Sequence, residues 1–326
     1  MLAHALQVGE RCVVVMGSAH QAPSPKNPFD WQTRARMVLQ SLSEADAARV
    51  DILPLRDYYD GDRWASALRH GVAGFTPPGG EVALISHYKD MSSAYLNWFP
   101  EWQTAAFPRQ NDVDATPIRE ALFAALSQDP TGQRAAACIN AGLPTGTRHV
   151  LSEWITSPEA HHVAREWAVL QAEQKAWSVA PYPPILVTVD AVIVCMGHVL
   201  LVERGRMPGE GLLAVPGGFL DPHERIDDAA LRELQEETGL SLSAVDARNT
   251  LKASRVFDHP TRSQRGRVVT HAYHFELPAT QLPDVQGADD ARSARWIPIA
   301  DLTRMENRFF DDHFHILDSF LGLLPR

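Results

Sequence analysis

The stretch from Gly218 to Leu240 constrains the fold more than any other part of the chain. It reads as a glycine loop followed by an acidic amphipathic helix, and Gly239 stands where a helix ends in a left-handed residue. Glu233, Glu236 and Glu237 are spaced i, i+3 and i, i+4, so their carboxylates share one face of that helix. We therefore predict a helix that presents three carboxylates together.

A cation would stabilise such a face, because neighbouring carboxylates repel one another. Hard carboxylate oxygens suit Mg²⁺ or Mn²⁺, and these ions bind phosphate groups in turn. Glu224 lies at the junction of loop and helix, from which it can reach the same region as a fourth ligand. Gly218 allows the backbone to approach a metal or a phosphate closely. On the charges alone, a solvated acidic helix face stays open as the alternative.

Length and composition indicate a two-domain protein without nucleic-acid or membrane partners. The chain has 326 residues, enough for two hydrophobic cores, and its net charge of −10 disfavours binding to nucleic acids or anionic membranes. No apolar run approaches the length of a membrane span. Three scattered cysteines form no metal or disulfide pattern, which is typical of a reducing cytosol. We expect a cytoplasmic protein that binds small molecules, with homo-oligomerisation left open.

The N-terminal half alternates strands with helices, which is the pattern of a parallel α/β sheet. We expect strands at 12–16, 50–55 and 82–86 with helices between them, followed by a mainly helical region from 117 to 178. The prolines of 181–184 stiffen and interrupt the chain. We therefore expect one domain at 1–180 and a second at 181–326.

Strand-like runs precede the acidic helix in the C-terminal half. Residues 186–195 and 198–203 are expected to form two strands joined by a turn, and residues 213–219 a further strand that enters the glycine loop.

A cluster of cations follows the acidic helix. Arg262, Arg265 and Arg267 lie within six residues of an otherwise acidic protein, and such a group suits a diphosphate or a terminal phosphate. For each arginine, a place in a charged hairpin loop stays open as the alternative. Phe257, just upstream, either stacks on an adenine or packs in the core.

The whole string from Gly218 to Leu240, G-x5-E-x7-R-E-L-x-E-E-x-G-L, resembles the signature of the Nudix hydrolases at each fixed position. The resemblance implies an α/β/α sandwich around a mixed sheet, and metal-assisted cleavage of a nucleoside diphosphate linked to another group. It also implies that Glu233, Glu236 and Glu237 are catalytic metal ligands. We expect Arg232 to orient a carboxylate rather than to contact the substrate.

Short motifs in the N-terminal half resemble an archaeal-type nicotinamide mononucleotide (NMN) adenylyltransferase, a nucleotidyltransferase-like fold. They are Gly17-Ser-Ala19, Asn27-Pro-Phe29, His87-Tyr-Lys89-Asp90, Phe99-Pro-Glu-Trp102 and Asp114-Ala-Thr116-x-x-Arg119. Their order is similar to that in bifunctional NMN adenylyltransferase/Nudix proteins. The resemblance implies that Thr116 and Arg119 bind ATP phosphates, and ATP and NMN would be ligands of this domain. A surface position for Arg119, paired with a neighbour such as Glu120, stays open.

The first strand of that family, with its H-x-G-H turn, has no recognisable counterpart in this sequence. In the family its histidines stabilise the transferring phosphoryl group, and His4 is no substitute because it lies on an expected helix. We expect a parallel sheet that lacks this first strand, which puts the transferase activity of the chain in question. Either the sequence begins at an internal methionine of a longer protein, or the domain has lost its activity.

The stretch around the three arginines is also similar to a segment of the bifunctional proteins and of NAD-related Nudix regulators, which favours ADP-ribose as the ligand. Phe310-Asp-Asp-His313 continues the resemblance without a defined role. The expected reaction converts ADP-ribose to AMP and ribose 5-phosphate. Two alternatives stay open: a sensor that binds ADP-ribose without cleaving it, and a Nudix enzyme that acts on another dinucleotide.

Overall fold

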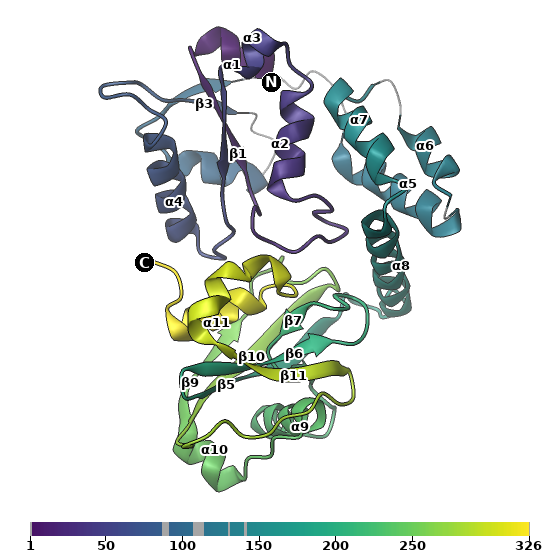
Figure 1. Cartoon of the computed structure of the whole chain (residues 1–326), viewed down its shortest axis with the longest axis vertical. Helices are drawn as coiled ribbons and strands as arrows, with labels where there is room; N and C mark the ends of the chain where they lie inside the picture. Colours follow the sequence, from purple (N-terminus) through teal and green to yellow (C-terminus); the bar gives the residue numbers. More distant parts are fainter. Residues whose placement is uncertain (1, 87–90, 107–113, 130, 140–141, 326) are drawn as a thin grey trace. The chain divides into compact units, whose positions relative to one another are not determined.

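The computed structural model in Figure 1 describes residues 2–86, 91–106, 114–129, 131–139 and 142–325. The chain forms two compact units. The N-terminal unit comprises residues 1–20 and 27–165, and the C-terminal unit comprises residues 21–26 and 166–326. The domain boundary that we expect near residue 180 stays a prediction. The motif at 87–90 lies outside the described residues.

The N-terminal unit contains two pairs of parallel strands. The strands β1 (Cys12–Met16) and β2 (Val50–Pro54) form one pair, and β3 (Ala83–Ser86) and β4 (Gln103–Ala106) form the other. Parallel pairing is what the alternation of strands and helices predicts, but the two pairs form separate sheets.

The helices of this unit lie between and after its strands. They are α1 (Leu2–Val8), α2 (Trp31–Leu39), α3 (Glu44–Ala47), α4 (Gly61–Ala73), η1 (Met91–Trp98), α5 (Ala115–Gln128), α6 (Gln133–Cys138) and α7 (Thr145–Trp154). Asp30 caps α2 by accepting a hydrogen bond from the Thr33 N–H, which satisfies a donor that the first turn leaves free. The next helix, α8 (Pro158–Trp177), begins in this unit and ends in the other.

The C-terminal unit is built on one mixed sheet. Its strands are β5 (Ile185–Cys195), β6 (His198–Arg204), β7 (Leu213–Ala214), β8 (Gly217–Phe219), β9 (Leu251–Phe257), β10 (Arg267–Leu277) and β11 (Ala291–Pro298). The order is β11-β6-β5-β10-β9, with β7 beside β6 and β8 beside β5. Only β5 and β10 run parallel, and the other pairs are antiparallel.

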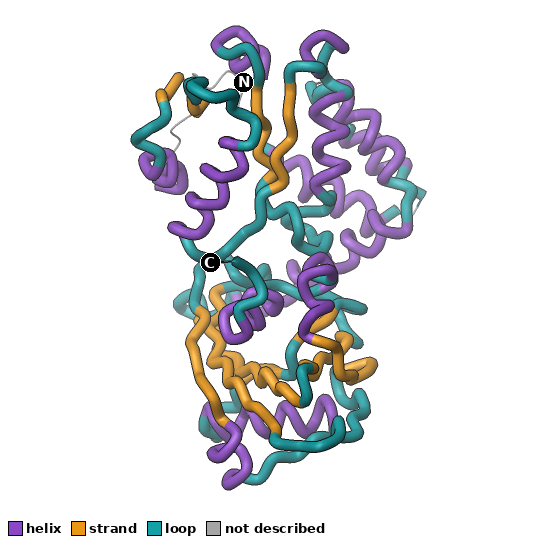
Figure 2. Tube along the Cα trace, turned by 60° about the vertical axis from the view of Figure 1, so that its left-hand side comes forward, coloured by secondary structure: helices purple, strands orange, loops and turns teal. Residues whose placement is uncertain are grey.

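Helices cover both faces of this sheet (Figures 1 and 2). One face carries α9 (Ile226–Thr238) and α10 (Ala244–Thr250), and the other carries α11 (His313–Leu321), which follows the short helices η2 (Ile299–Arg304) and η3 (Glu306–Arg308). The expected α/β/α sandwich is therefore confirmed. None of the described helices is both long and apolar enough to cross a membrane.

The core of the C-terminal unit explains the sequence pattern of its central strands. Ile193 of β5 and Leu200 of β6 are fully buried and pack with Leu234 of α9. Because β5 is covered on both faces, it reads as a continuous apolar run rather than an alternating one. Leu234 anchors α9 on the sheet, and the helix ends at Gly239, whose φ of 70° is left-handed as predicted.

Candidate active site

The acidic helix α9 turns two of its three glutamates inward. Glu233 and Glu237, one helical turn apart, are 9% and 6% exposed, whereas Glu236 is exposed. The inward pair faces strand β8 and its glycines. The predicted carboxylate face therefore exists, and Glu236 lies at its solvent-exposed edge.

Arg232 gathers the carboxylates of the acidic stretch. It donates two hydrogen bonds to Glu224, at 2.6 and 3.0 Å, and one each to Glu233 and Glu236 at 2.8 Å. The orienting role predicted for Arg232 is confirmed, and it extends to Glu224. These hydrogen bonds lower the pKa of Glu224 below its ordinary value. Within the part of the chain that the structure describes, no group of three or more acidic, histidine or cysteine side chains is already placed around a metal position.

The titration of Glu237 is strongly shifted. Burial raises its pKa to about 8, against the opposing effect of a hydrogen bond from the Gly217 N–H at 3.0 Å, and the charge of Glu233 adds to the rise. Burial also raises the pKa of Glu233, although Arg232 opposes it. Arg232 offsets the charge of Glu233 but has no hydrogen bond to Glu237, and a divalent cation with oxygen ligands fits the negative charge that remains.

Strand β8 makes room for these carboxylates because two glycines stand side by side. Gly217 and Gly218 pair with Asp190 and Val189 of β5. A Cβ atom on Gly218 would lie 2.5 Å from the Glu233 Oε1 atom, and one on Gly217 would collide with the Val189 carbonyl oxygen. The close approach that we predict at Gly218 is therefore an approach to a carboxylate in this structure.

The two glycines should respond differently to alanine. In Gly217→Ala the methyl group meets backbone that cannot yield, so we expect a loss of roughly 1–3 kcal/mol of folding free energy. In Gly218→Ala the methyl group meets the mobile end of Glu233, so stability should change little while kcat/KM falls roughly a hundredfold through displacement of that carboxylate. Urea unfolding and steady-state kinetics on both variants check this. Equal effects of both substitutions on stability would contradict the assignment.

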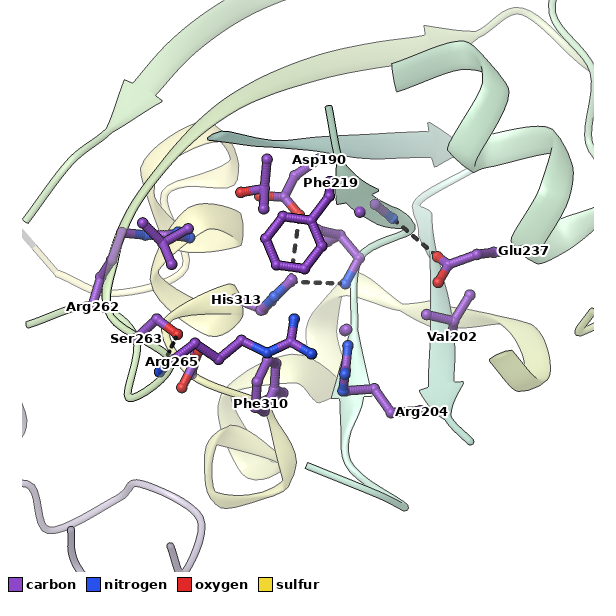
Figure 3. A pocket seen from close by; sticks show the side chains of 17 residues that line it. Asp190, Val202, Arg204, Phe219, Glu237, Arg262, Ser263, Arg265, Phe310 and His313 are labelled. Carbon is purple, nitrogen blue, oxygen red and sulfur yellow. Dashed lines mark hydrogen bonds and ion pairs between the residues drawn. The ribbon is translucent and has the colours of Figure 1, made fainter. Parts of the chain in front are cut away.

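A pocket opens beside Glu237 (Figure 3). Strands β5, β6 and β8, the loop before β10 and the segment before α11 line it. Two guanidiniums lie over aromatic rings of its wall: Arg204 is 4.3 Å from the ring centre of Phe310, and Arg265 is 5.1 Å from that of Phe219. A pocket with cations beside a carboxylate pair is suited to a phosphate group that also binds a metal.

The three predicted arginines have three different environments. Arg262 is 5% exposed and forms a bidentate ion pair with Asp312, at 2.7 and 2.9 Å. Although Arg262 lines the pocket, its guanidinium is occupied by that carboxylate. Arg265 lines the pocket and also contacts Glu173 of α8 at 3.3 Å. Arg267 donates to the Asp258 carbonyl and is not among the pocket residues. Of the three, Arg265 is therefore the one that lines the pocket without a buried carboxylate partner, which is the environment that phosphate binding requires.

Phe257 also lies outside the pocket. Its ring packs edge-on against Phe320 of α11, with 6.1 Å between ring centres. Of the two readings for this residue, the structure favours packing over stacking on a base.

Several pocket residues were not predicted. Arg204 ends an ordinary-looking strand, so nothing local in the sequence marks it. Asp311 and His313 belong to the Phe310-Asp-Asp-His313 motif, which had no assigned role. Burial raises the pKa of Asp311 to about 7 and lowers that of His313 to about 3. His313 is therefore neutral at physiological pH, and its Nδ1 atom accepts a hydrogen bond from the Val215 N–H at 3.2 Å.

Thr116 and Arg119 lie near the N-terminus of α5 in the N-terminal unit. Asp114 caps this helix through the Thr116 N–H at 2.9 Å, and Arg119 donates to the Thr116 hydroxyl at 3.1 Å. The predicted pair is thus side by side at a helix N-terminus, where backbone N–H groups favour anions.

Comparison with known proteins agrees with both units. A family model of the NUDIX domain matches residues 184–320. The nicotinamide/nicotinic acid mononucleotide adenylyltransferase of Acinetobacter baylyi is 34% identical over 120 residues, which are 36% of this chain and 64% of that protein. An ADP-ribose pyrophosphatase of Methanocaldococcus jannaschii is 29% identical over 135 residues, 41% of this chain and 72% of that protein.

A solved structure matches almost the whole chain. It is a bifunctional NMN adenylyltransferase/ADP ribose pyrophosphatase from Francisella tularensis, with 30% sequence identity, a TM-score of 0.88, and coverage of 98% of this chain and 93% of that chain. A second structure of a protein so described, complexed with AMP and a manganese ion, has a TM-score of 0.87.

The fold and the site define a Nudix hydrolase domain fused to an NMN adenylyltransferase-like unit. More specifically, the chain belongs to the family of bifunctional NMN adenylyltransferase/Nudix hydrolases.

Proposed function

We propose that the C-terminal unit is a divalent-metal-dependent pyrophosphatase that hydrolyses ADP-ribose to AMP and ribose 5-phosphate. The observation that carries this proposal is the pair of buried carboxylates, Glu233 and Glu237, next to a pocket that contains guanidiniums. Relatives described as ADP-ribose pyrophosphatases support the choice of substrate.

The proposed metal ligands are Glu233, Glu236 and Glu237, with Glu224 as a weaker fourth. Mg²⁺ or Mn²⁺ bound there would neutralise the diphosphate and lower the pKa of a water molecule. The manganese ion in the Francisella tularensis structure supports a cation of this kind. In this chain, Arg232 orients Glu233 and Glu236, and the Gly217 N–H holds Glu237.

The reaction that we propose is the attack of water on one phosphorus of the diphosphate. An oxygen–phosphorus bond forms, the bridging phosphorus–oxygen bond breaks, and the water gives up a proton. The guanidinium of Arg265 is placed to bind the diphosphate, because it faces the pocket from the loop before β10. Charge-assisted hydrogen bonds of this kind also hold the substrate in register with the carboxylates.

A product assay tests the proposal. Purified protein with ADP-ribose and Mg²⁺ should release AMP and ribose 5-phosphate in a ratio of one to one, and excess EDTA should abolish the release. Binding of ADP-ribose without products would instead identify a sensor. Faster cleavage of NADH, a diadenosine polyphosphate or a nucleotide sugar would identify that compound as the substrate. The proposed class of reaction would stay the same.

For the N-terminal unit we propose binding of ATP and NMN, with Thr116 and Arg119 on the ATP phosphates. The helix N-terminus that carries both residues supports this role. NAD formation from ATP and NMN, measured in the same preparation, tests the transferase activity independently of hydrolysis. The absence of NAD together with intact ATP binding would leave a nucleotide-binding domain without transfer.

A further inference from the structure

Residues 21–26 come from the N-terminal half of the sequence but belong to the C-terminal unit. The chain leaves the N-terminal unit for these six residues, returns to it, and crosses again after residue 165. Ala22 and Pro25 of this segment are buried, and a second proline, Pro23, further restricts its backbone. The segment, which we call the strap, is thus a packed and stiff part of the C-terminal unit.

The strap holds the residue that precedes Arg265. The backbone N–H of Lys26 donates to the Oε1 atom of Gln264 at 2.9 Å, although the two residues are 238 positions apart in the sequence. Helix α8 holds the same residue at a second point, because the Nε2 atom of Gln174 donates to the Gln264 carbonyl oxygen at 3.2 Å. Both the side chain and the backbone of Gln264 are therefore fixed by segments that are distant in the chain.

Arg265 itself is supported by contacts that leave its guanidinium available. Its nitrogen atoms lie 3.3 and 3.4 Å from the two carboxylate oxygens of Glu173, which is long for charged hydrogen bonds, and its charged group lies 5.1 Å from the ring centre of Phe219. Fixing an arginine side chain costs conformational entropy. A site that fixes it before the ligand arrives avoids this cost on binding.

The loop after Arg265 does not supply such support. Gly266 has a φ of 150° and is exposed, and a Cβ atom there would meet nothing within 4 Å. Glycine is the residue with the widest choice of backbone conformations, so the loop needs an anchor on the other side of Arg265. Gln264 is in the position to provide it.

We propose that Gln264 is a positioning residue, through which the strap and α8 set the place of Arg265 in the pocket. The inference rests on the proposed function, in which Arg265 binds the diphosphate. The strap, Glu173 and Gln174 all lie outside residues 184–320, which match the NUDIX family model. The pyrophosphatase pocket of this chain thus depends on residues that precede its Nudix domain.

Steady-state kinetics on the full chain test the positioning role. Gln264→Met keeps the length of the side chain but removes the acceptor, and Lys26→Pro removes the donor. Each should raise KM for ADP-ribose roughly three- to tenfold, the effect of one lost hydrogen bond, and should leave kcat nearly unchanged. The double variant should raise KM no further than either single variant, because both substitutions remove the same bond.

Two conservative variants serve as controls for these kinetics. Lys26→Ala keeps the backbone N–H, so its KM should equal that of wild type. Gln264→Glu keeps an oxygen acceptor for that N–H, so it should recover most of the loss seen in Gln264→Met.

Hydrogen exchange in the ligand-free protein measures the same role without catalysis. The peptide that spans residues 262–267 should exchange several-fold faster in Gln264→Met and Lys26→Pro than in wild type, because local opening requires less free energy once an anchoring bond is lost. The peptide of α9 should exchange at the wild-type rate in both variants, which shows that the unit stays folded.

Two results would overturn the inference. One is unchanged exchange at residues 262–267 in both variants, and the other is an effect on KM that is absent or that adds in the double variant. Failure of the proposed function has a different signature. A wild-type protein that releases no AMP from ADP-ribose, while exchange at 262–267 rises in both variants, would refute the pyrophosphatase and keep the role of the strap.

Discussion

Glu237→Gln is expected to lower kcat for ADP-ribose by roughly a thousandfold or more while the protein stays folded. The substitution keeps the side-chain shape and an acceptor for the Gly217 N–H, but it removes the charge that we propose to bind the cation. A thousandfold corresponds to about 4 kcal/mol of transition-state stabilisation, which is the scale of a lost contribution to metal-ion catalysis. AMP release at saturating Mg²⁺ measures it.

The same substitution should stabilise the metal-free protein, and the gain should depend on pH. Burial raises the pKa of Glu237 from 4.5 to about 8 in the folded state. Between these values the unfolded chain releases its proton while the folded protein retains it, so the folded state of wild type loses stability as pH rises. The difference in stability between Glu237→Gln and wild type should therefore grow in favour of the variant as pH rises from 4.5 to 8, by a few kcal/mol at most.

Urea unfolding in EDTA at pH 5 and pH 8 measures this gain, and Glu236→Gln provides the matched control. Glu236 lies on the same helix but is exposed, so its substitution should change stability little at either pH. Adding Mg²⁺ should stabilise wild type and have a much smaller effect on Glu237→Gln. Equal stabilisation of both proteins by Mg²⁺ would show that Glu237 is not a ligand.

Breaking the ion pair between Arg262 and Asp312 should produce the largest loss of stability. The two side chains are 5% and 2% exposed. Removing one partner leaves the other charge buried, which costs about 3–5 kcal/mol in comparable pairs. We therefore expect Arg262→Met and Asp312→Asn each to be strongly destabilised in urea unfolding. The double variant should be less destabilised than the sum of the two single variants, because neither charge is left without its partner.

Measuring activity together with stability distinguishes a structural role of Arg262 from substrate binding. The pair joins the loop before β10 to the segment before α11, and both segments line the pocket, so activity should fall together with stability. Arg267→Met is the control, since among the described residues Arg267 donates only to the Asp258 carbonyl oxygen, so its substitution should change the free energy of unfolding by less than about 0.5 kcal/mol. A stable Arg262→Met with a raised KM would instead restore the substrate-binding reading of Arg262.

Local patterns predicted several of the helices and strands. The region expected to be mainly helical, 117–178, corresponds to the helices α5 to α8, and the strands expected at 186–195 and 198–203 are β5 and β6, because proline, glycine and apolar periodicity act over a few residues. The same holds for Gly239, whose left-handed backbone follows from the helix that it ends. Spacing also placed Arg232 four residues before Glu236, which the structure confirms as a 2.8 Å contact.

The arginines show where such patterns stop being informative. Arg262, Arg265 and Arg267 are nearly equivalent in sequence, yet one is neutralised by Asp312, one faces the pocket and one turns to a backbone carbonyl. Asp312 is fifty residues away from Arg262 in the chain, so no local signal announces the pairing. Arg204 presents the converse case, since nothing local in the sequence marks it and only the fold brings it to the pocket.

The sequence by itself determined the acidic helix, the glycines before it and the family to which both belong. These features depend on contacts between residues close in the chain, whose geometry a helix or a turn dictates. Only the tertiary structure decided which glutamates are buried, which arginines line the pocket and which of them is neutralised by a buried carboxylate. Burial and charge pairing depend on what distant segments bring to the same place, and from that the pKa values and the ligand-binding capacity of the site follow.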